Sequence, residues 1–384
     1  MGSIRFGANF AASSVVNNMI EYYGKNHIQV LDYDGSVIQE TYLNTGDEFA
    51  LPAGPVHENL TFQGWSSPIQ SVNNKITVGR GDMAIGAVYT TKSGQNEFDI
   101  ELTSVSGLTV TFKMNGTKDW GDGTTDTSTS HTYSQVGKYT IKCNGTQFTN
   151  ISSSSGVFGQ SQPSQNYTLK AIRLATVQTI PAYSFIQCFS TEYMTLSNTV
   201  TTIGQYCFQM NVSLKSIIIP SNVTTIGDYA LGYNMSTPTV VLPYGLTHLG
   251  EQQFLYCTGL KYLYEPDTVT TVGEHLHQNA YALESLHVPA NLTALGTSYA
   301  TNCYSLTKLK FPSTITSVGE ASFANDFSII EYDFSEAIQV PTLMNTDVFL
   351  GINATTKIKV PASLYDEWIN STNWSNFANY IEAV

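Results

Sequence analysis

The chain has 384 residues, of which 42% are hydrophobic and only 12% are Asp, Glu, Lys or Arg, and its formal net charge is −13. This length and apolar content suffice for two or three folded domains and argue against a disordered chain. The negative charge and the lack of any Lys/Arg-rich run exclude nucleic acid as a partner, because phosphate binding requires clustered basic residues. No stretch approaches the roughly 20 apolar residues of a membrane-spanning helix, so no membrane insertion is expected.

Residues 1–26 fit none of the fold patterns found further along the chain. Their apolar run is broken and contains a single Arg, which is a poor match to a signal peptide. We interpret 1–26 as an arm that docks on a neighbouring chain, as in a homo-oligomer or a virion. If the protein is displayed on a cell or virion surface, either a leader peptide has been removed, or the protein reaches that surface by assembly, as phage structural proteins do.

Residues 27–91 are expected to form a small β module. Ile28–Gly35 predicts a strand and a turn, and Leu51–Pro55, Thr61–Trp65 and Ile85–Tyr89 follow it as further strand and turn signals. The order of these motifs resembles the Listeria–Bacteroides β-grasp-like repeat. That resemblance implies a spacer or an accessory binding unit.

Residues 92–150 carry a second β pattern, in which a tight-turn signal precedes alternating strands. Trp120–Thr125, His131–Tyr133 and Gly137–Ile141 are the segments concerned. They resemble the polycystic-kidney-disease (PKD) type of β-sandwich. We expect His131 to be a hydrogen-bonded structural residue, because no partner Ser or Cys lies in a nucleophile motif.

Three carboxylates in this region, Asp119, Asp122 and Asp126, could suggest a calcium site. Their spacing lacks the ligand count of a dedicated calcium loop, so turn chemistry is the preferred interpretation. No metal site is predicted here. The five cysteines form no CxxC pair, so no zinc site is predicted either.

Residues 165–340 repeat with a period of 23. Counted from the Gly of each repeat, apolar residues stand at +4, +10, +13, +15, +19 and +22, Cys or Asn at +7, and Pro at +16. The markers are Ile203-Gly204, Ile226-Gly227, Leu249-Gly250, Val272-Gly273, Leu295-Gly296 and Val318-Gly319. The +13/+15 alternation predicts a short strand that the Pro ends. One unit cannot bury its apolar face alone, so the repeats must stack into a solenoid.

This repeat resembles the BspA-like (Treponema pallidum-type) leucine-rich repeat. The residues that carry the resemblance are Leu306, Leu309, Phe311-Pro312, Ile315, Val318-Gly319, Ala321 and Phe323. The resemblance implies binding and adhesion roles with ligands that vary between members. Thr237, Glu265, His277 and Ala300 depart from the pattern, and we expect them to weaken individual units without disturbing the register.

The +7 position takes Cys188, Cys257 or Cys303 in some repeats and Asn211, Asn234 or Asp326 in others. A position that accepts Cys, Asn or Asp is typical of a buried turn in which a small side chain satisfies backbone groups. Free cysteine is usually a small buried residue, so a structural role is preferred.

Residues 341–384 are expected to cap the solenoid. The period breaks after Phe334, and the tail from Val360-Pro361 resembles a segment that often follows these repeats in gut-bacterial and phage proteins. Its apolar residues could form an amphipathic helical cap over the last repeat; they are Leu364, Trp368, Trp374, Phe377 and Ile381. Stacking of the two tryptophans on a sugar ring is the less favoured alternative.

A catalytic role is not expected. The sequence contains no GxSxG elbow, no HExxH motif, no phosphate-binding loop and no dinucleotide-binding glycine fingerprint. Carboxylate pairs such as Glu265/Asp267 fall at repeat edges, where solvated charge is the default. We therefore predict no enzyme, no catalytic residue and no cofactor.

The residues that flank the inward strand positions, at +12 and +14, should face outward from the repeat sheet. In three consecutive repeats they combine aromatic, imidazole and ammonium groups that would suit a glycan or an acidic protein patch; they are Tyr262, Tyr264, Ser285, His287, Lys308 and Lys310. A solvated sheet without any ligand is an equally weighted alternative.

Together these features predict a mainly β fold in which a leucine-rich-repeat solenoid of 23-residue repeats follows two small β domains. The predicted function is non-enzymatic recognition of a surface glycan or protein, outside the cell, at a bacterial surface or on a virion. One form of such a protein would be a phage receptor-binding or fibre component, which recognises a surface ligand as part of a virion. The alternative is a purely structural spacer or decoration protein.

Overall fold

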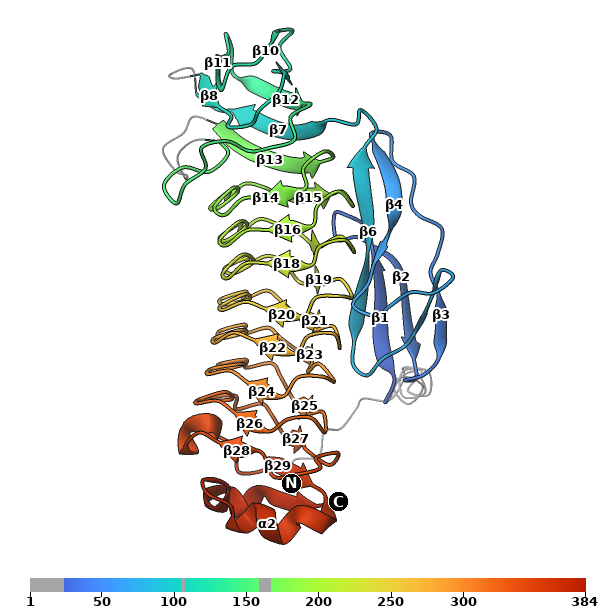
Figure 1. Cartoon of the computed structure of the whole chain (residues 1–384), viewed down its shortest axis with the longest axis vertical. Coiled ribbons are helices and arrows are strands. Elements are labelled where there is room, and N and C mark those ends of the chain that lie inside the picture. Colours follow the sequence, from blue (N-terminus) through green and yellow to red (C-terminus); the bar gives the residue numbers. More distant parts are fainter. Residues whose placement is uncertain (1–23, 105–107, 159–166) are drawn as a thin grey trace, which may run out of the picture.

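The computed structural model of the chain describes residues 24–104, 108–158 and 167–384 (Figure 1). Nearly all of the arm predicted for residues 1–26 lies outside these residues. The fold is mainly β, as predicted: two small β units precede a straight stack of repeats, and a short helical segment follows them.

Residues 24–91, called the N-terminal module below, form a four-stranded sheet of order β2-β1-β6-β4. The central strands β1 and β6 are parallel, and the outer strands pair with them antiparallel. Alternate side chains of the central strands, such as Val30 and Ile85, pack against Phe49 and Ile76 of a separate two-stranded sheet. The strands are β1 (Asn26–Leu31), β2 (Val37–Leu43), β3 (Glu48–Ala50), β4 (Leu60–Ser66), β5 (Lys75–Thr77) and β6 (Met83–Thr91).

The second unit packs a two-stranded sheet, β11-β8, against a larger sheet of order β10-β9-β12-β7-β13-β15. Trp120 is fully buried between them, where its indole stacks on His131 at 4.9 Å and its carbonyl accepts the Tyr133 hydroxyl at 2.8 Å. The strands are β7 (Asn96–Leu102), β8 (Thr109–Thr111), β9 (Lys118–Asp119), β10 (Thr125–Asp126), β11 (Ser130–Thr132) and β12 (Gly137–Cys143).

The polar residues of this unit have structural roles. His131 Nε2 lies 2.8 Å from Asp122 Oδ2, which confirms a hydrogen-bonded structural histidine. The three carboxylates accept turn hydrogen bonds from nearby backbone N–H groups: Asp119 from Gly121, Asp122 from Thr124 and Asp126 from Ser128. These contacts are the turn chemistry expected from their spacing.

Strand β13 (Tyr167–Leu174) joins the second unit to the solenoid. It pairs antiparallel with β7 on one side and parallel with β15 (Tyr193–Leu196) on the other. One sheet therefore runs from the second unit into the repeats, and a single hydrophobic core extends from Phe98 to Ile381. The second unit closes the first end of the solenoid, as a repeat protein requires.

Each repeat contributes one short strand to each of two parallel ladders. Between the regular repeats, bonded partners are 23 residues apart, for example Ile203↔Ile226 and Leu263↔Leu286, which confirms the repeat. One ladder contains β14 (Thr179–Ile180), β16 (Thr202–Ile203), β18 (Thr225–Ile226), β20 (His248–Leu249), β22 (Thr271–Val272), β24 (Ala294–Leu295) and β26 (Ser317–Val318). The other, called the strand face below, contains β15, β17 (Ile217–Ile218), β19 (Val240–Val241), β21 (Tyr262–Tyr264), β23 (Ser285–His287), β25 (Lys308–Lys310) and β27 (Glu331–Asp333).

The Gly marker permits close stacking of the turns. A Cβ on Gly227 would lie 2.5 Å from the backbone nitrogen of Gln205 in the preceding repeat. Such a contact is shorter than any van der Waals distance, so the period depends on Gly at this position.

The +7 position is a ladder of side chain to backbone hydrogen bonds. Asn211 Oδ1 accepts the N–H of Cys188 at 2.7 Å, and Asn234 Oδ1 accepts the N–H of Asn211 at 3.0 Å. Asp326 Oδ1 accepts the N–H of Cys303 at 2.6 Å. These contacts confirm a buried turn position in which a small polar group satisfies the backbone.

Asp326 differs from Asn234 of this ladder because its Oδ2 is buried without a hydrogen-bond partner among the described residues, whereas Asn234 Nδ2 donates to the carbonyl of Leu231. Burial raises the pKa of Asp326 well above its usual value. We expect Asp326→Asn to stabilise the fold by about 1 kcal/mol, because an amide nitrogen at this position can donate to backbone carbonyls, as Asn234 does.

The same substitution should remove a pH dependence. Since the folded-state pKa of Asp326 is raised, its favourable contribution is complete below about pH 4, the ordinary titration range of Asp, and is lost as pH rises through the folded-state pKa. Denaturant unfolding of both proteins between pH 4 and pH 8 measures this. Equal pH slopes would contradict the assignment.

The solenoid continues for one irregular turn beyond the break at Phe334. Ser317 pairs with Thr342 and Glu331 with Lys357, so this turn is slightly longer than the others. The elements of the end are β28 (Thr342–Leu343), η1 (Thr346–Phe349), β29 (Lys357–Val360), η2 (Ala362–Leu364), α2 (Tyr365–Asn370), η3 (Trp374–Tyr380) and β30 (Ile381–Ala383).

The two tryptophans of the cap are core residues. Trp368 and Trp374 are both 0% exposed, and Trp374 Nε1 donates to the carbonyl of Pro341 at 2.6 Å. Their rings lie 5.2 Å apart and contact Phe334 of the last regular repeat. The alternative of sugar stacking is therefore wrong for both.

Two departures from the repeat pattern meet inside the solenoid. Glu265 and His277 are both fully buried, with Nε2 and Oε1 3.1 Å apart, although these two atoms are not aligned for a hydrogen bond. Tyr299 completes the group: its hydroxyl donates to Glu265 Oε2 at 2.6 Å, and its carbonyl lies 3.1 Å from His277 Nδ1. The two departures therefore lie side by side in adjacent repeats, and the 23-residue register of the ladders is kept around them.

Candidate binding site

The N-terminal module lies on the strand face of the solenoid, with β6 crossing several of its strands (Figure 1). The outward residues Ile218 and Val241 are 7% and 1% exposed, because they pack against Leu31, Ala84 and Val88 of the module. Much of the surface that the sequence predicts to face solvent is thus a contact between two parts of the chain.

Hydrogen bonds along this contact hold the module in one position. Asn198 N–H donates to the Gln63 side chain at 2.8 Å, and Tyr244 N–H donates to the carbonyl of Ser67 at 2.7 Å. Just after β1, the carbonyl of Tyr33 accepts the Ser216 hydroxyl at 2.6 Å.

A sequence signal for this contact exists in the strands of the second and third repeats. Ile217–Ile219 and Val240–Leu242 are continuous apolar runs, whereas a strand with one solvated face alternates. Such runs indicate burial on both faces, so they could have predicted a covering element. They do not say which segment of the chain provides it.

The prediction that Tyr264 faces solvent is wrong. Its ring points away from the solenoid core as expected, but it is 3% exposed and belongs to the core of the N-terminal module with Ile28 and Val30. A Cβ on Gly79 would lie 2.2 Å from its hydroxyl, which shows how closely the module covers it. Burial raises the pKa of Tyr264, so this phenol stays neutral.

Tyr262 and Ser285 are only partly covered. The ring of Tyr262 meets His27 of the module edge-on at 5.7 Å, and its hydroxyl donates to Glu284 at 3.2 Å. Burial and the charge of Glu284 raise the pKa of Tyr262 to about 12. Ser285 lies beside Tyr262 in the parallel ladder and is half-buried.

The two lysines, on the sixth strand of the face (β25), are exposed. Lys308 lies 3.9 Å from Glu331, and Lys310 lies 3.6 Å from Asp333 and 3.2 Å from Glu336. Exposed ion pairs of this kind contribute little to stability. Of the six predicted residues, His287 and Lys310 line one cleft, while Tyr262, Tyr264, Ser285 and Lys308 lie outside it.

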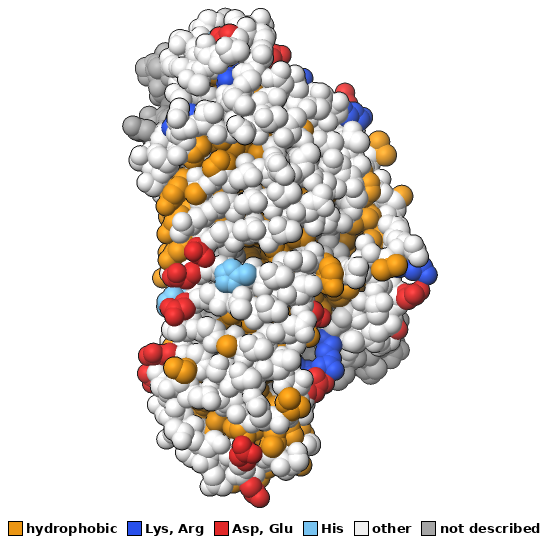
Figure 2. All heavy atoms as spheres, in the orientation of Figure 1, with side chains coloured by type: hydrophobic (Ala, Val, Ile, Leu, Met, Phe, Trp, Pro, Cys, Tyr) orange, Lys and Arg blue, Asp and Glu red, His pale blue; other side chains and the backbone are white. Residues whose placement is uncertain are grey.

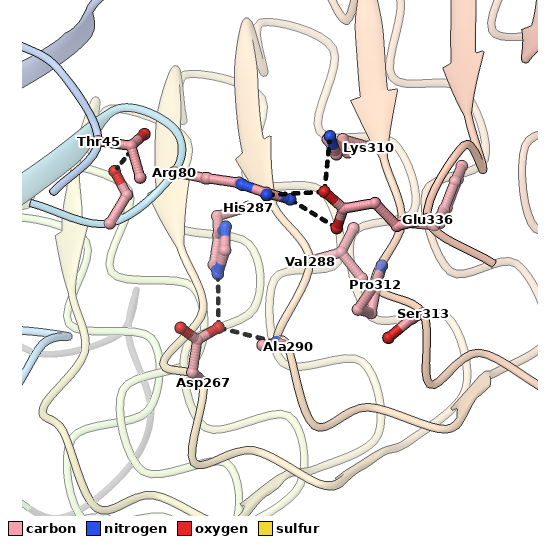
Figure 3. A pocket seen from close by; sticks show the side chains of 12 residues that line it. Thr45, Arg80, Asp267, His287, Val288, Ala290, Lys310, Pro312, Ser313 and Glu336 are labelled. Carbon is pink, nitrogen blue, oxygen red and sulfur yellow. Dashed lines mark hydrogen bonds and ion pairs between the residues drawn. The ribbon is translucent and has the colours of Figure 1, made fainter. Parts of the chain in front are cut away.

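This cleft has a volume of about 400 Å³ and lies where the edge of the module meets the solenoid (Figure 3). Thr45, Gly79 and Arg80 of the module form one wall. The repeats form the rest, from four successive turns: Asp267, His287, Val288, Ala290, Lys310, Phe311, Pro312, Ser313 and Glu336. Binding sites commonly occur at such boundaries between domains.

An imidazole–carboxylate pair occupies one side of the cleft. His287 stacks on the buried ring of Tyr264 at 3.9 Å, and its Nε2 lies 2.8 Å from Asp267 Oδ1. The same oxygen accepts the N–H of Ala290 at 2.7 Å. Burial acts to raise the pKa of Asp267, but the hydrogen bond and charge of His287 outweigh it, and the pKa is lowered.

A charged bridge between the module and the repeats occupies the other side. The guanidinium of Arg80 binds both oxygens of Glu336 at 2.7 Å, and Lys310 approaches the same carboxylate at 3.2 Å. The hydrogen bond from Arg80 lowers the pKa of Glu336 to about 2. Both carboxylates of the cleft are therefore ionised at neutral pH.

Because each charge in the cleft has a partner, the site has no preference for a strongly charged ligand. It offers ordered donors and acceptors around an apolar floor that includes Val288, Phe311 and Pro312. Neither Arg80 nor Glu336 was predicted from the sequence, since they lie far apart in the chain and in no local motif. For Asp267 the sequence predicted only a solvated carboxylate at a repeat edge, paired with Glu265.

Two absences hold for the part of the chain that the structure describes. No cluster of three or more His, Cys, Asp or Glu side chains there could hold a metal ion. Among those same residues, no helix combines the length and the hydropathy needed to span a membrane.

Solved structures of bacterial leucine-rich repeat proteins are similar to parts of this chain. A leucine-rich cell surface protein of Faecalibacterium prausnitzii is 20% identical over 55% of this chain, which spans 62% of that protein, at a TM-score of 0.36. The T. pallidum leucine-rich repeat protein is 20% identical over 47% of this chain and 90% of the T. pallidum chain, at a TM-score of 0.39. A leucine-rich repeat protein of Bacteroides ovatus is 16% identical over 55% of this chain and 71% of the B. ovatus chain, at a TM-score of 0.38.

No curated protein matches the chain. The BspA type leucine-rich repeat region matches in six copies, over residues 178–303 and 273–379. Together these matches cover more than half of the sequence and coincide with the stacked repeats and their cap. The chain therefore belongs to the family of BspA-type leucine-rich repeat proteins.

Proposed function

We propose that this protein is a non-enzymatic recognition protein of the bacterial surface that binds a neutral saccharide unit of a surface glycan in the cleft beside Arg80. Membership of a repeat family with surface-protein relatives supports the surface setting. The observation that carries the binding role is the cleft itself, where an N-terminal accessory module and the repeats complete one site.

The chemistry of the cleft favours a sugar over a charged peptide. A sugar ring has hydroxyl groups that both donate and accept hydrogen bonds, and C–H groups that can lie on an apolar floor. The Asp267/His287 pair and the Arg80/Glu336 pair offer acceptors and donors to adjacent hydroxyls, while Pro312 and Val288 supply apolar contact.

The test is a glycan array followed by calorimetry on its best binder. We expect His287→Gln and Asp267→Asn each to weaken binding at least tenfold, because each removes a charge-assisted hydrogen bond worth about 1.5–3 kcal/mol. Lys308→Ala is the matched control, since Lys308 lies on the next strand but outside the cleft. Unchanged affinity in both cleft variants, with their folds intact, would exclude the cleft.

A second candidate is a rigid spacer or decoration protein of a cell surface or virion. The continuous core from the second unit to the cap favours this role, because it makes the described repeats one stiff body. The proposed relations of residues 27–91 to β-grasp-like repeats and of residues 92–150 to PKD-type sandwiches suit either role. Mass photometry of native particles would separate them, since a spacer would be found as a fixed oligomer or bound to virions.

A further inference from the structure

The cleft lies at the end of the N-terminal module that is remote from its attachment to the second unit. Residues 92–95 make that attachment, between β6 and β7. Strand β6 has nine residues and therefore extends about 30 Å from the attachment toward the cleft (Figure 1). The part of the module beyond it, residues 44–50 and 75–82, is called the free end below. It includes the cleft wall formed by Thr45, Gly79 and Arg80.

The contacts of the attached half of the module are apolar and hydrogen-bonded. The outward side chains of Ile218 and Val241 pack against the module there, close to Gly86 in the middle of β6. The hydrogen bonds of this half reach residues 198–244 of the repeats; they are Gln63–Asn198, Ser66–Ile219, Tyr33–Ser216 and Ser67–Tyr244. This half is therefore expected to stay on the strand face.

At the free end, an exposed ion pair joins the module to the repeats. Arg80 binds Glu336 at 2.7 Å, with 53% and 39% of their side chains exposed. Exposed pairs of this kind contribute little free energy, and added salt screens them. Figure 3 shows the pair crossing from the module to the repeats, and in Figure 2 basic and acidic side chains lie together where this end of the module meets the solenoid.

A buried hydroxyl at the same end opposes closure. The ring of Tyr264 inserts into the core of the module, but its hydroxyl is buried and has no hydrogen-bond partner among the described residues. A Cβ on Gly79 would lie 2.2 Å from this oxygen, so the free end itself covers the hydroxyl. An unsatisfied buried donor costs free energy, and water would satisfy it once the free end lifts.

We propose that the free end is a lid on the cleft. The module rocks on its contact with Ile218 and Val241, and the Arg80–Glu336 pair holds the closed form. Insertion of the Tyr264 ring also favours closure, whereas its unpaired hydroxyl favours opening. The lid itself requires no ligand.

Lid closure and ligand binding are coupled, a consequence that rests on the proposed function. Arg80 and Gly79 lie on one wall of the cleft and His287 on the other, so a ligand that contacts both walls binds only the closed form. Such a ligand shifts the equilibrium toward closure by its differential affinity for the two forms. The cleft would thus be completed as its ligand binds.

Electron paramagnetic resonance with spin labels at Thr77→Cys and Lys308→Cys measures the opening in the full chain. Both positions are exposed, lie on strands and stand outside the cleft lining. Cys188→Asn removes the half-buried native thiol and introduces the residue that the next repeats have at this position. The closed form gives one distance, and opening adds a population at longer distance.

Two substitutions should move this population in opposite directions. We expect Arg80→Gln to raise the ratio of open to closed form about two- to fivefold, and a rise in salt from about 0.05 M to 0.5 M to act in the same direction on the wild type. Adding Tyr264→Phe to Arg80→Gln keeps the ring and removes the unpaired hydroxyl, so it should lower the ratio at least about fivefold.

Lys75→Gln is the matched control. It breaks another exposed ion pair near the same end, Lys75–Glu48 at 2.9 Å, but both of its partners belong to the module. The distances should not change in this variant. The lid is excluded if Arg80→Gln and high salt leave the distances as they are in the wild type, or if Lys75→Gln changes them as much as Arg80→Gln does.

The coupling is tested by adding the best binder from the glycan array to the labelled Arg80→Gln protein at a saturating concentration. We expect the population at longer distance to disappear. A sugar that binds in calorimetry and leaves this population unchanged would overturn the coupling alone. If no glycan binds, the proposed function and the coupling both fail, while the distances measured without sugar still decide whether the lid exists.

Discussion

A His277→Phe variant is expected to lose about 1–3 kcal/mol of folding free energy, because the fully buried carboxyl group of Glu265 would lose the polar imidazole beside it. Phe is a conservative replacement in shape, since His277 stacks parallel on Phe254 at 5.5 Å and the +4 position is Phe in several other repeats. The loss would come from Glu265. Its buried carboxyl group would keep only the hydrogen bond from the Tyr299 hydroxyl and would face an apolar ring in place of the imidazole. Denaturant unfolding monitored by circular dichroism measures it.

Restoring the whole apolar pattern should recover the stability. In Glu265→Leu/His277→Phe/Tyr299→Phe no buried polar group of the cluster remains, and replacement of such clusters by apolar residues is often neutral or stabilising. His248→Ala, at an exposed histidine, is the control and should change stability by less than about 0.5 kcal/mol. Additive effects of the three substitutions would show that these side chains do not act as a unit.

An Ile218→Asp variant is expected to release the N-terminal module from the strand face. Ile218 is 7% exposed in an apolar contact with the module, and an aspartate there would place an unpaired charge in that contact. The repeats should remain folded, because the substituted side chain points away from the solenoid core. Small-angle X-ray scattering should show a larger radius of gyration, and trypsin should cut the module in preference to the repeats.

The matched control is Ile338→Asp, the same substitution at a residue that is 78% exposed. It should leave both the scattering curve and the cleavage pattern unchanged. If Ile218→Asp also gives the wild-type scattering curve, the apolar contact does not determine the position of the module.

The repeat fold was accessible from the sequence because its interactions are periodic. The Gly marker, the +7 polar position and the +13/+15 alternation each reflect contacts between adjacent repeats, so each recurs in the sequence wherever it recurs in space. The buried tryptophans of the cap followed from the same reasoning, because the last repeat must cover its apolar face.

The binding site could be predicted from the sequence only in part, because some of its contacts are not periodic. His287 and Lys310 follow from the repeat register, but Arg80 and Glu336 meet across the fold without any local pattern. The burial of Tyr264 depends on a module more than 170 residues earlier in the chain, and the Glu265–His277 pair joins two departures that the sequence presents as unrelated. Contacts of this kind have no period and therefore leave little trace in one sequence.

The most direct test of the docked arrangement is an engineered disulfide across the cleft. A Cβ on Gly81 of the module would lie 3.6 Å from the Cβ of His287, within the range of about 3.5–4.5 Å seen in disulfides. The native cysteines of the described chain are unpaired, and all but the half-buried Cys188 are buried. Gly24→Cys/His287→Cys is the control, because Gly24 shares the positive φ of Gly81 but has no neighbour within 4 Å.

Intact mass and thiol titration after mild oxidation report the outcome. If the module docks on the strand face as described, Gly81→Cys/His287→Cys should lose two hydrogens and both new thiols, reversibly, while the control keeps its thiols. If both new thiols remain titratable in the folded, oxidised protein, the module does not lie on the repeats in this way, and the composite cleft does not exist.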